Sequence, residues 1–223
     1  MIDWSAIDTV LLDMDGTLLD LHFDNYFWLE YLPARYAAAH GISFDASRAQ
    51  LFAHFKAHQG TLNWYCLEFW SDALSLDIQQ LKVDIKHKIK VRPFVTPFLQ
   101  ALRQSRKRLV LITNAHPQSL SLKMEVTRID GMLDMIISSH DYRHPKEAQA
   151  FWQTLQFNEP FDKQRTLFID DSLAVLDSAH RYGIQHLLSI HQPDSLKARR
   201  ISKYPAIEHF NEIMPSPSDL QRP

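Results

Sequence analysis

Short apolar runs alternate with helical segments along the second half of the chain, beyond Arg92-Pro93. Such runs predict buried strands, and they lie at 109–112, 133–137, 166–169 and 184–190, with a further run at 9–13. Segments with helical spacing begin near Pro117, after Pro145 and at Ser172. This alternation predicts right-handed βαβ crossovers, and therefore one parallel sheet with helices on its faces.

The stretch from about residue 22 to residue 90 has a helical pattern instead. Its clearest segment, 62–74, repeats apolar residues at i, i+3, i+4, i+7 and i+8, which predicts one amphipathic helix. The residues of this stripe are Leu62, Tyr65, Cys66, Phe69, Trp70, Ala73 and Leu74. A second stripe follows Asp77 and consists of Ile78, Leu81, Ile85 and Ile89. The lysines beside it are expected on the solvated face; they are Lys82, Lys86, Lys88 and Lys90.

Two other helical segments are predicted in this stretch. Leu51, Phe52 and Phe55 fall on one face of the segment 45–59, which we expect to be buried. Asp24 precedes an aromatic segment and is expected to cap its helix, because a carboxylate oxygen accepts hydrogen bonds from the free amides of a first turn. The whole stretch is therefore expected to be an all-helical bundle.

These patterns predict an α/β protein with two domains. A Rossmann-like core with a parallel sheet comprises residues 1–20 and 92–223. An all-helical cap, residues 21–91, is inserted after the first strand.

Composition is that of a globular protein without a strong charge bias. The chain has 223 residues, of which 45% are hydrophobic, and a formal net charge of -2. This balance lacks the basic field that is typical of nucleic-acid-binding proteins. Cys66 is the only cysteine, which excludes an internal disulfide and a cysteine-rich zinc site. The start of the chain lacks a signal-peptide pattern and no apolar run approaches membrane-spanning length, so we expect a soluble, cytoplasmic protein.

Polar side chains follow several of the predicted strands. They are Asp13 and Asp15 after the first run, Thr113 and Asn114 after the second, Lys146 beyond the third, and Asp170 and Asp171 after the fourth. Parallel strands end at one edge of a sheet, so we expect these side chains to converge. Four carboxylates beside one lysine would repel each other without a cation, and oxygen ligands favour Mg²⁺. Because Mg²⁺ also binds phosphate, a phosphate ester is the expected substrate.

With these motifs the chain resembles the haloacid dehalogenase superfamily of phosphohydrolases that carry a helical cap. Four motifs match in order, and they are Asp13-x-Asp15-Gly16-Thr17, Thr113-Asn114, Lys146 and Asp170-Asp171. The resemblance covers the whole chain and implies that Asp13 is a nucleophile that forms an aspartyl-phosphate. It implies that Asp15 is the general acid and then the general base. Dehalogenating relatives lack this second acid, so Asp15 favours phosphoryl transfer, although mutase and hydrolase are not separated.

The same resemblance implies roles for the remaining motif residues. Thr113 and the backbone near Asn114 would hold the phosphoryl oxygens, and Lys146 would neutralise charge between nucleophile and phosphate. It also implies the Mg²⁺ ligands, which are the side chains of Asp13 and Asp171, the backbone carbonyl of Asp15 and, directly or through water, Asp170.

Four stretches are similar to the bacterial GMP/IMP nucleotidases of this superfamily, namely Asp13 to Asp20, Phe23 to Trp28, Thr61 to Leu67 and Thr113 to Pro117. This similarity implies the hydrolysis of purine 5′-mononucleotides. Trp64 lies off the apolar stripe of its helix, so its indole is free to stack on a base. The alternative is that Trp64 simply completes the packing of the cap.

Other functions stay open on the sequence alone. The enzyme alternative is a phosphatase for another small phosphate, such as a sugar phosphate. A phosphoacceptor signalling domain is a second alternative, because receiver domains also gather acids, a hydroxyl and a lysine at strand ends; the inserted cap counts against it. A catalytically silent binding protein is the third. His54 and His58 have a zinc-like spacing, but no third ligand completes the pattern, and a solvated helix face is expected.

Overall fold

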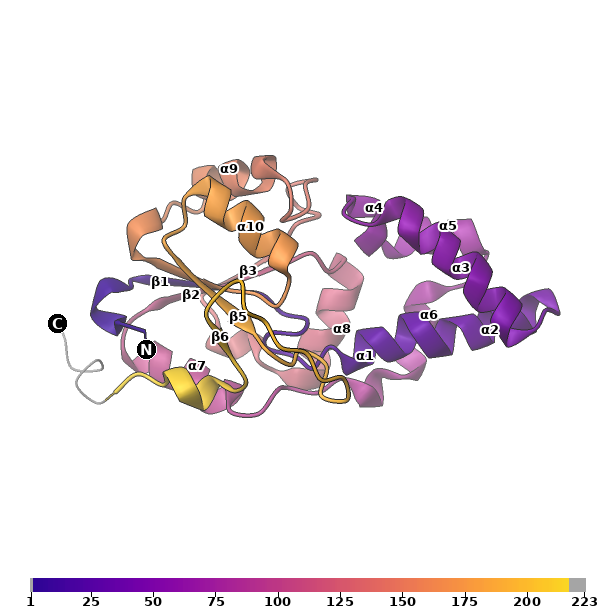
Figure 1. Cartoon of the computed structure of the whole chain (residues 1–223), viewed down its shortest axis with the longest axis horizontal. Coiled ribbons are helices and arrows are strands. Elements are labelled where there is room, and N and C mark those ends of the chain that lie inside the picture. The colour runs from indigo at the N-terminus through magenta and orange to yellow at the C-terminus, as the bar shows by residue number, and fades with distance from the viewer. Residues whose placement is uncertain (1, 217–223) are drawn as a thin grey trace.

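A six-stranded parallel sheet forms the centre of the protein in the computed structural model, which describes residues 2–216 (Figure 1). The strands follow the order β3-β2-β1-β4-β5-β6. Their bounds are Thr9–Leu12 for β1, Arg108–Thr113 for β2, Met135–Ser138 for β3, Thr166–Ile169 for β4, His186–Ile190 for β5 and Ala206–Ile207 for β6. The prediction of a parallel-sheet α/β core is therefore confirmed.

Strand β1 lies inside the sheet, and its last residue is level with the end of β4 and with a residue near the end of β2. Leu12 pairs with Leu111 of β2 and with Ile169 of β4. The amide of Asp13 then donates to the carbonyl of Ile169 at 3.0 Å. The residues that follow these strands are therefore held at one edge of the sheet.

The strand side chains alternate between two apolar layers, because successive residues of a strand point to opposite faces. Val10 and Leu12 belong to the layer that includes helix α7 (Val95–Gln104), and α8 (Pro117–Thr127) packs against it. Leu11 belongs to the opposite layer, with α9 (Gln149–Asn158) and α10 (Leu173–Tyr182). The helix α7 and the short strand β6 were not predicted from the sequence.

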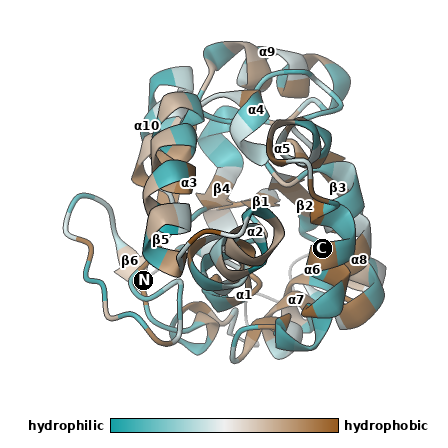
Figure 2. Cartoon of the chain, turned by 90° about the vertical axis from the view of Figure 1, so that its right-hand side faces the viewer, coloured by the Kyte–Doolittle hydropathy of each residue, from teal (hydrophilic) through white to brown (hydrophobic). Residues whose placement is uncertain are grey.

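Helices α1 to α6 form the cap, which lies beyond the edge of the sheet (Figure 1). Their bounds are His22–Tyr26 for α1, Leu32–His40 for α2, Phe44–His58 for α3, Leu62–Tyr65 for α4, Leu67–Leu74 for α5 and Ile78–Asp84 for α6. A π-helical turn, Phe27–Tyr31, joins α1 to α2 without a break. Seen from the cap side, the helices carry hydrophobic residues on one side and hydrophilic residues on the other (Figure 2). The inserted helical cap that the sequence predicts is confirmed.

Two chain segments join the cap to the sheet, and they pair with each other. The amide of Asp20 donates to the carbonyl of Lys90 at 2.9 Å, and the amide of Arg92 donates to the carbonyl of Leu18 at 3.0 Å. One apolar cluster continues from Leu12 in β1 through Phe23 and into the cap. The domain limits at 20/21 and 91/92 stay a prediction, although the paired segments lie at these positions.

The prediction of one helix over 62–74 is wrong, because the helix is interrupted at Cys66. This residue has extended backbone angles and ends α4 while it begins α5. In an unbroken helix the carbonyl of Trp64 would accept a hydrogen bond from the amide four residues later. Here it accepts from the indole of Trp70 at 2.9 Å. The break also buries Leu67, which lies off the predicted stripe, and leaves Ala73 exposed.

The stripe at 45–59 is only partly correct. Leu51 and Phe55 are buried in α3, whereas Phe52 is 64% exposed. Residues 51 and 55 are one helical turn apart, but residue 52 is rotated by about 100° from residue 51.

Among residues 2–216, no helix is both long enough and apolar enough to cross a lipid bilayer.

Candidate active site

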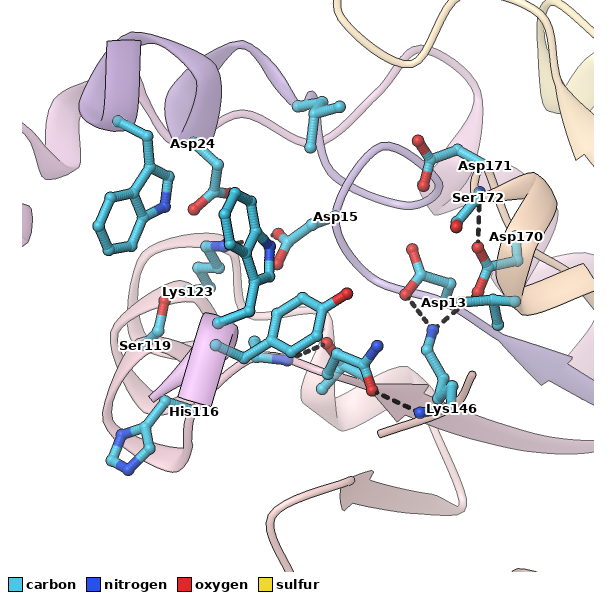
Figure 3. A pocket seen from close by; sticks show the side chains of 18 of the residues that line it. Asp13, Asp15, Asp24, His116, Ser119, Lys123, Lys146, Asp170, Asp171 and Ser172 are labelled. Carbon is cyan, nitrogen blue, oxygen red and sulfur yellow. Dashed lines mark hydrogen bonds and ion pairs between the residues drawn. The ribbon is translucent and has the colours of Figure 1, made fainter. Parts of the chain in front are cut away.

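The carboxyl ends of β1, β2 and β4 open into a pocket of about 260 Å³ between the sheet and the cap. Asp13, Thr113 and Asp170 follow or end these three strands and line the pocket. Figure 3 shows Asp13 and Asp170 on this side of it. The cap supplies the opposite wall, including Trp64 and Tyr65. The pocket is therefore bounded by polar strand ends and by aromatic rings.

Lys146 is buried at the centre of the acidic side chains. Its ammonium donates to Asp13 Oδ1 at 2.5 Å, to Asp170 Oδ2 at 2.7 Å and to the carbonyl of Ile112 at 3.1 Å. The loop between β3 and α9 places Lys146 here, because its amide donates to Asn114 Oδ1 at 2.9 Å. The neighbouring carboxylates raise the pKa of Lys146 against the effect of its burial, so the ammonium stays charged.

Asp13 has one carboxylate oxygen without a partner. Its Oδ2 is buried and makes no hydrogen bond, while Oδ1 is held by Lys146. Burial raises the pKa of Asp13 to about 6, although Lys146 acts in the opposite direction. Burial, together with Asp170 and Asp13, raises the pKa of Asp171 well above its usual value. The acids carry more negative charge than Lys146 can neutralise.

A divalent cation fits this part of the pocket. Oxygen atoms of Asp13, Asp170 and Asp171 all lie within 4.8 Å of one another. The orphaned Oδ2 of Asp13 and the charge excess are both relieved by a hard cation with carboxylate ligands. Asp170 is the least available of the three, because its oxygens already accept from Lys146 at 2.7 Å and from the amide of Ser172 at 2.7 Å.

Gly16 allows Asp171 to approach the first motif. It has φ +88°, in the left-handed region where glycine is favoured, and a Cβ at this position would lie 2.7 Å from Asp171 Cγ. The glycine is therefore required both by its backbone angle and by the carboxylate beside it.

Asp15 belongs to a separate chain of charges that enters the cap. Lys123 of α8 donates to Asp15 Oδ1 at 2.6 Å and to Asp24 Oδ2 at 2.7 Å. Asp24 Oδ1 in turn accepts from Lys82 of α6 at 2.8 Å. Lys123 is 1% and Lys82 2% exposed. Acid and ammonium groups thus alternate from the sheet edge to the cap.

This chain of charges sets the ionisation of its two acids in opposite directions. Burial raises the pKa of Asp15 to about 6; Lys123 opposes this, and Asp24 adds to it. Burial would also raise the pKa of Asp24, but the ammonium groups of Lys123 and Lys82 outweigh it and hold the pKa far below its usual value. Asp24 therefore stays ionised, whereas Asp15 can exchange a proton near neutral pH.

A hydrogen-bonded bridge connects the cap to the second motif. The Tyr65 hydroxyl donates to Glu147 Oε1 at 2.9 Å, and Asn114 Nδ2 donates to Glu147 Oε2 at 3.0 Å. Asn114 is thus held on both sides of its amide, because its oxygen accepts from the Lys146 amide.

Comparison with known proteins identifies the family of the chain. A profile of the haloacid dehalogenase-like hydrolases matches residues 7–183. The chain belongs to this family. The hydrolase is also 41% identical, over 216 residues, to the GMP/IMP nucleotidases YrfG of Escherichia coli K12 and of Shigella flexneri, which covers 96% of this chain and 97% of each relative. These matches confirm the prediction of an enzyme that acts as a phosphatase.

Solved structures share the fold of the hydrolase at low sequence identity. A HAD phosphatase from Thermococcus onnurineus superposes with a TM-score of 0.76 at 21% identity and covers 92% of this chain and 95% of its own. CbbY from Rhodobacter sphaeroides in complex with phosphate gives a TM-score of 0.66 at 14% identity. The match covers 92% of this chain and 96% of the CbbY chain. These two comparisons show the fold over 92% of the chain.

The hydrolase brings together the seven residues to which the sequence assigns a role in catalysis, phosphate binding or metal binding at the strand ends. All seven line the same pocket, and they are Asp13, Asp15, Thr113, Asn114, Lys146, Asp170 and Asp171. Thr113 is 1% exposed, and its hydroxyl accepts from the amide of Ala115 at 3.0 Å. Trp64 also lines the pocket, and its ring packs edge-on against Phe55 at 5.9 Å. The two roles that the sequence suggests for Trp64, stacking on a base and packing within the cap, are therefore compatible.

Three residues of the hydrolase escaped the sequence analysis. Lys82 was expected on a solvated face, which is wrong because its side chain is buried in an ion pair with Asp24. Asp24 was expected to cap a helix, which is also wrong because it lies inside α1 and pairs with lysines instead. Lys123 was not considered at all. A helical pattern marks a lysine as exposed by default, and the burial of these two is tolerable because Asp24 pairs with both and Asp15 pairs with Lys123.

His54 and His58 do not form a metal site in the described part of the chain. Two groups of metal-ligating side chains occur among residues 2–216, and neither contains these histidines. His58 instead packs edge-on against Phe69 at 4.6 Å. His54 is exposed, as the sequence predicts, whereas His58 is half-buried by this packing.

Proposed function

We propose that the protein is a Mg²⁺-dependent phosphomonoesterase that hydrolyses purine 5′-mononucleotides such as GMP and IMP. The observation that carries this proposal is the unpartnered Oδ2 of Asp13, which lies in the same pocket as Lys146 and the aromatic wall of the cap. The identity of 41% to two GMP/IMP nucleotidases supports the choice of substrate.

Asp13 is the proposed nucleophile. Its carboxylate forms a bond to phosphorus while the bond from phosphorus to the nucleoside 5′-oxygen breaks. Lys146 donates to Oδ1 at 2.5 Å, and Oδ2, which makes no hydrogen bond, is the oxygen that is left to bind Mg²⁺. The same ammonium offsets negative charge between the carboxylate and the incoming phosphate.

Asp15 is the proposed general acid and base. In the first step it donates its proton to the departing 5′-oxygen, which leaves as an alcohol. In the second step it accepts a proton from the water that attacks phosphorus, and the phosphate leaves Asp13. The pKa of Asp15, raised to about 6 chiefly by burial, suits a group that must carry a proton in one step and lose it in the other.

Asp13 and Asp171 are the proposed side-chain ligands of Mg²⁺, with the backbone carbonyl of Asp15. Asp170 is proposed to act through water, because both of its oxygens already accept hydrogen bonds. When bound, Mg²⁺ supplies positive charge that neutralises the acids and orients the phosphate. Oxygen ligands alone favour Mg²⁺ over zinc.

Thr113 and the backbone near Asn114 are proposed to bind the phosphoryl oxygens. Thr113 ends β2 and Asn114 is fixed through Glu147 and Lys146, so the donors here are already ordered. Trp64 is proposed to stack on the purine base, since its ring is part of the cap wall of the same pocket.

A substrate panel tests this proposal. Phosphate release is measured with GMP, IMP, pyrimidine mononucleotides and sugar phosphates, with Mg²⁺ and with excess EDTA. We expect Mg²⁺-dependent release that is fastest with the purine nucleotides, and none above background in Asp13→Asn. Faster release from a sugar phosphate would contradict the proposed substrate but not the mechanism. An active Asp13→Asn enzyme would overturn the mechanism.

A further inference from the structure

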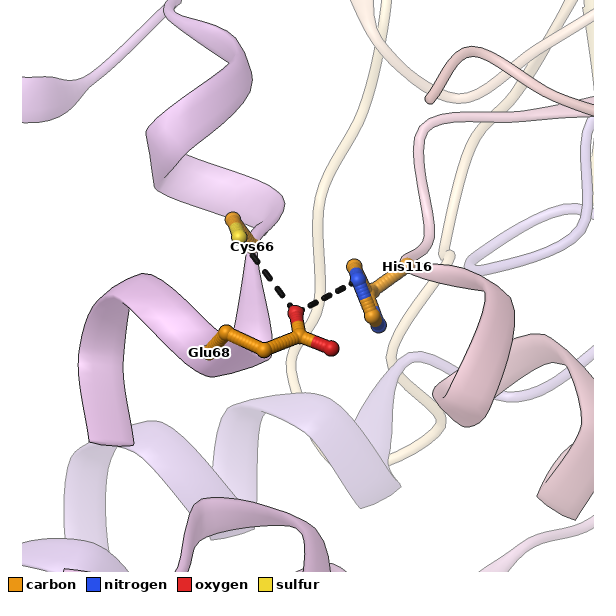
Figure 4. A group of neighbouring side chains, drawn as sticks. All are labelled: Cys66, Glu68 and His116. Carbon is orange, nitrogen blue, oxygen red and sulfur yellow. Dashed lines mark hydrogen bonds and ion pairs between the residues drawn. The ribbon is translucent and has the colours of Figure 1, made fainter. Parts of the chain in front are cut away.

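A second group of metal-ligating side chains lies between the cap and the core. Cys66 and Glu68 come from the junction of α4 and α5, and His116 comes from the loop that begins α8 (Figure 4). Their ligand atoms all lie within 4.8 Å of one another. Glu68 Oε2 lies 2.6 Å from His116 Nε2 and 3.5 Å from Cys66 Sγ. The group is separate from the acids around Asp13.

We propose that Cys66, Glu68 and His116 bind a thiophilic divalent cation such as Zn²⁺, which joins the cap to the core. A thiolate, an imidazole and a carboxylate are the three ligand types of zinc sites, and three protein ligands leave a fourth position for water. Mg²⁺ selects oxygen ligands instead, so the two metal sites of the protein prefer different ions.

The two distances that Glu68 makes to the other ligand atoms are close to those of a bound ion. Zinc bonds of about 2.0–2.3 Å in a tetrahedron place sulfur and oxygen about 3.5 Å apart. The Cys66 to Glu68 distance of 3.5 Å already has this value. The Glu68 to His116 distance of 2.6 Å must open to about 3.3 Å. The Glu68 side chain is 56% exposed, so it is free to move by this amount.

Binding the ion releases a proton from the protein. The thiol of Cys66 loses its proton to solvent when sulfur bonds the metal, and the proton on His116 Nε2 moves to Nδ1 through solvent. Nδ1 then loses a long hydrogen bond of 3.4 Å from the Gln118 amide. Cys66 binds as the thiolate. This cost makes the site weaker than a structural zinc site, and binding should tighten as pH rises.

The position of the site suggests its consequence. His116 and Leu67, the residue that follows Cys66, both line the catalytic pocket. An ion that bonds the cap and the core at this point holds them together beside the pocket. Release of a nucleoside requires the cap to separate from the core, so the bound ion is expected to slow turnover without displacing Mg²⁺.

Cobalt provides a direct test, because a cysteine thiolate bonded to Co²⁺ gives a charge-transfer band in the near ultraviolet. Co²⁺ is titrated into the full-length protein in saturating Mg²⁺. We expect the band to appear with one equivalent and to be displaced by Zn²⁺. The band should be lost in Cys66→Ser, where serine keeps the helix cap that Cys66 provides at the Phe69 amide.

Two further variants separate a three-residue site from a simple thiol adduct. Glu68→Gln and His116→Gln should each weaken Co²⁺ binding at least tenfold, whereas His54→Gln, an exposed histidine of the cap, should leave the titration unchanged. A band that survives both substitutions with the same affinity, or no band in the wild-type protein, would overturn the proposal.

The functional consequence has its own measurement. Zn²⁺ at one equivalent should slow hydrolysis by the wild-type enzyme and not by Cys66→Ser, both in saturating Mg²⁺. Equal inhibition of the two proteins would show that zinc acts at the catalytic acids and would overturn the inhibitory role. The cobalt titration does not depend on the identity of the substrate, so a failure of the nucleotidase proposal leaves it intact.

Discussion

Lys123 Nζ lies 2.6 Å from Asp15 Oδ1, which joins the proposed general acid to a buried ammonium group of the core. The same ammonium lies 2.7 Å from Asp24 of the cap. The ion pairs fix the direction of the Asp15 carboxyl, because Lys123 is itself held from both sides. Lys123 is therefore a positioning residue for proton transfer, and the cap contributes to its position through Asp24.

Replacement of Lys123 should lower kcat/KM most for substrates whose leaving group needs a proton from a general acid. For Lys123→Met we expect kcat/KM to fall by about 10- to 100-fold with GMP, since general acid catalysis is worth at least this much. With p-nitrophenyl phosphate, whose leaving group departs without a proton, the loss should be less than about threefold. Steady-state kinetics with both substrates measure the ratio.

Lys82→Met is the matched control for this ratio. Lys82 pairs with Asp24 but not with Asp15, so its replacement should change kcat/KM for GMP and for p-nitrophenyl phosphate by the same factor. Equal losses with the two substrates in Lys123→Met would contradict a role in proton transfer and would leave only a role in folding.

The buried charge of Asp13 should destabilise the Mg²⁺-free protein at neutral pH. Its folded-state pKa, raised to about 6, lies above the unfolded value of 3.8. The folded protein therefore binds the proton more tightly, so stability is present at low pH and is lost as pH rises through 6. We expect Mg²⁺-free Asp13→Asn to be more stable than the wild type at pH 7 by about 3 kcal/mol.

Chemical denaturation of both proteins between pH 5 and 7 measures this difference. The difference should shrink as pH falls, and histidine contributions cancel because they are common to both proteins. Adding Mg²⁺ should stabilise the wild type and not Asp13→Asn. A difference that is independent of pH would contradict a buried, ionising Asp13.

Gly16→Ala should weaken Mg²⁺ binding in addition to straining the backbone. Gly16 and Gly41 both have positive φ, +88° and +64°, so an alanine at either position costs about 1 kcal/mol of folding stability. Only at Gly16 would the new Cβ collide with Asp171. Displacement of a ligand is expected to lower Mg²⁺ affinity by about tenfold or more.

Gly41→Ala supplies the control, because no atom lies within 4 Å of its added Cβ. The Mg²⁺ concentration at half-maximal activity should be shifted in Gly16→Ala and not in Gly41→Ala. A shift of the same size in both variants would mean that backbone strain alone is responsible.

Trp64→Ala should raise KM for GMP by about tenfold, because stacking of one base on an aromatic ring is worth about 1–3 kcal/mol. KM for p-nitrophenyl phosphate should change little. Trp64→Phe keeps a ring beside Phe55 and should recover most of the GMP affinity. If KM rises equally for both substrates, the tryptophan serves the packing of the cap and not the base.

The parallel sheet and the convergence of its motif residues were predictable from the sequence because both depend on local pattern. A short apolar run followed by Asp13, Thr113 or Asp170 marks a strand and its carboxyl end. Parallel strands then bring these ends together, whatever the details of packing. The helical character of the cap was predictable in the same way, from the spacing of its apolar residues.

The helix break at Cys66 and the chain of ion pairs from Lys82 to Asp15 were decided only by the tertiary structure. Lys82 and Lys123 look like surface residues along the sequence, and their burial requires Asp24 to stand between them. The partner of Lys123 at Asp15 is distant in sequence, so no local pattern reports it. A pattern of apolar positions determines which elements form, but the desolvation of a charge depends on groups that only folding brings within hydrogen-bonding distance.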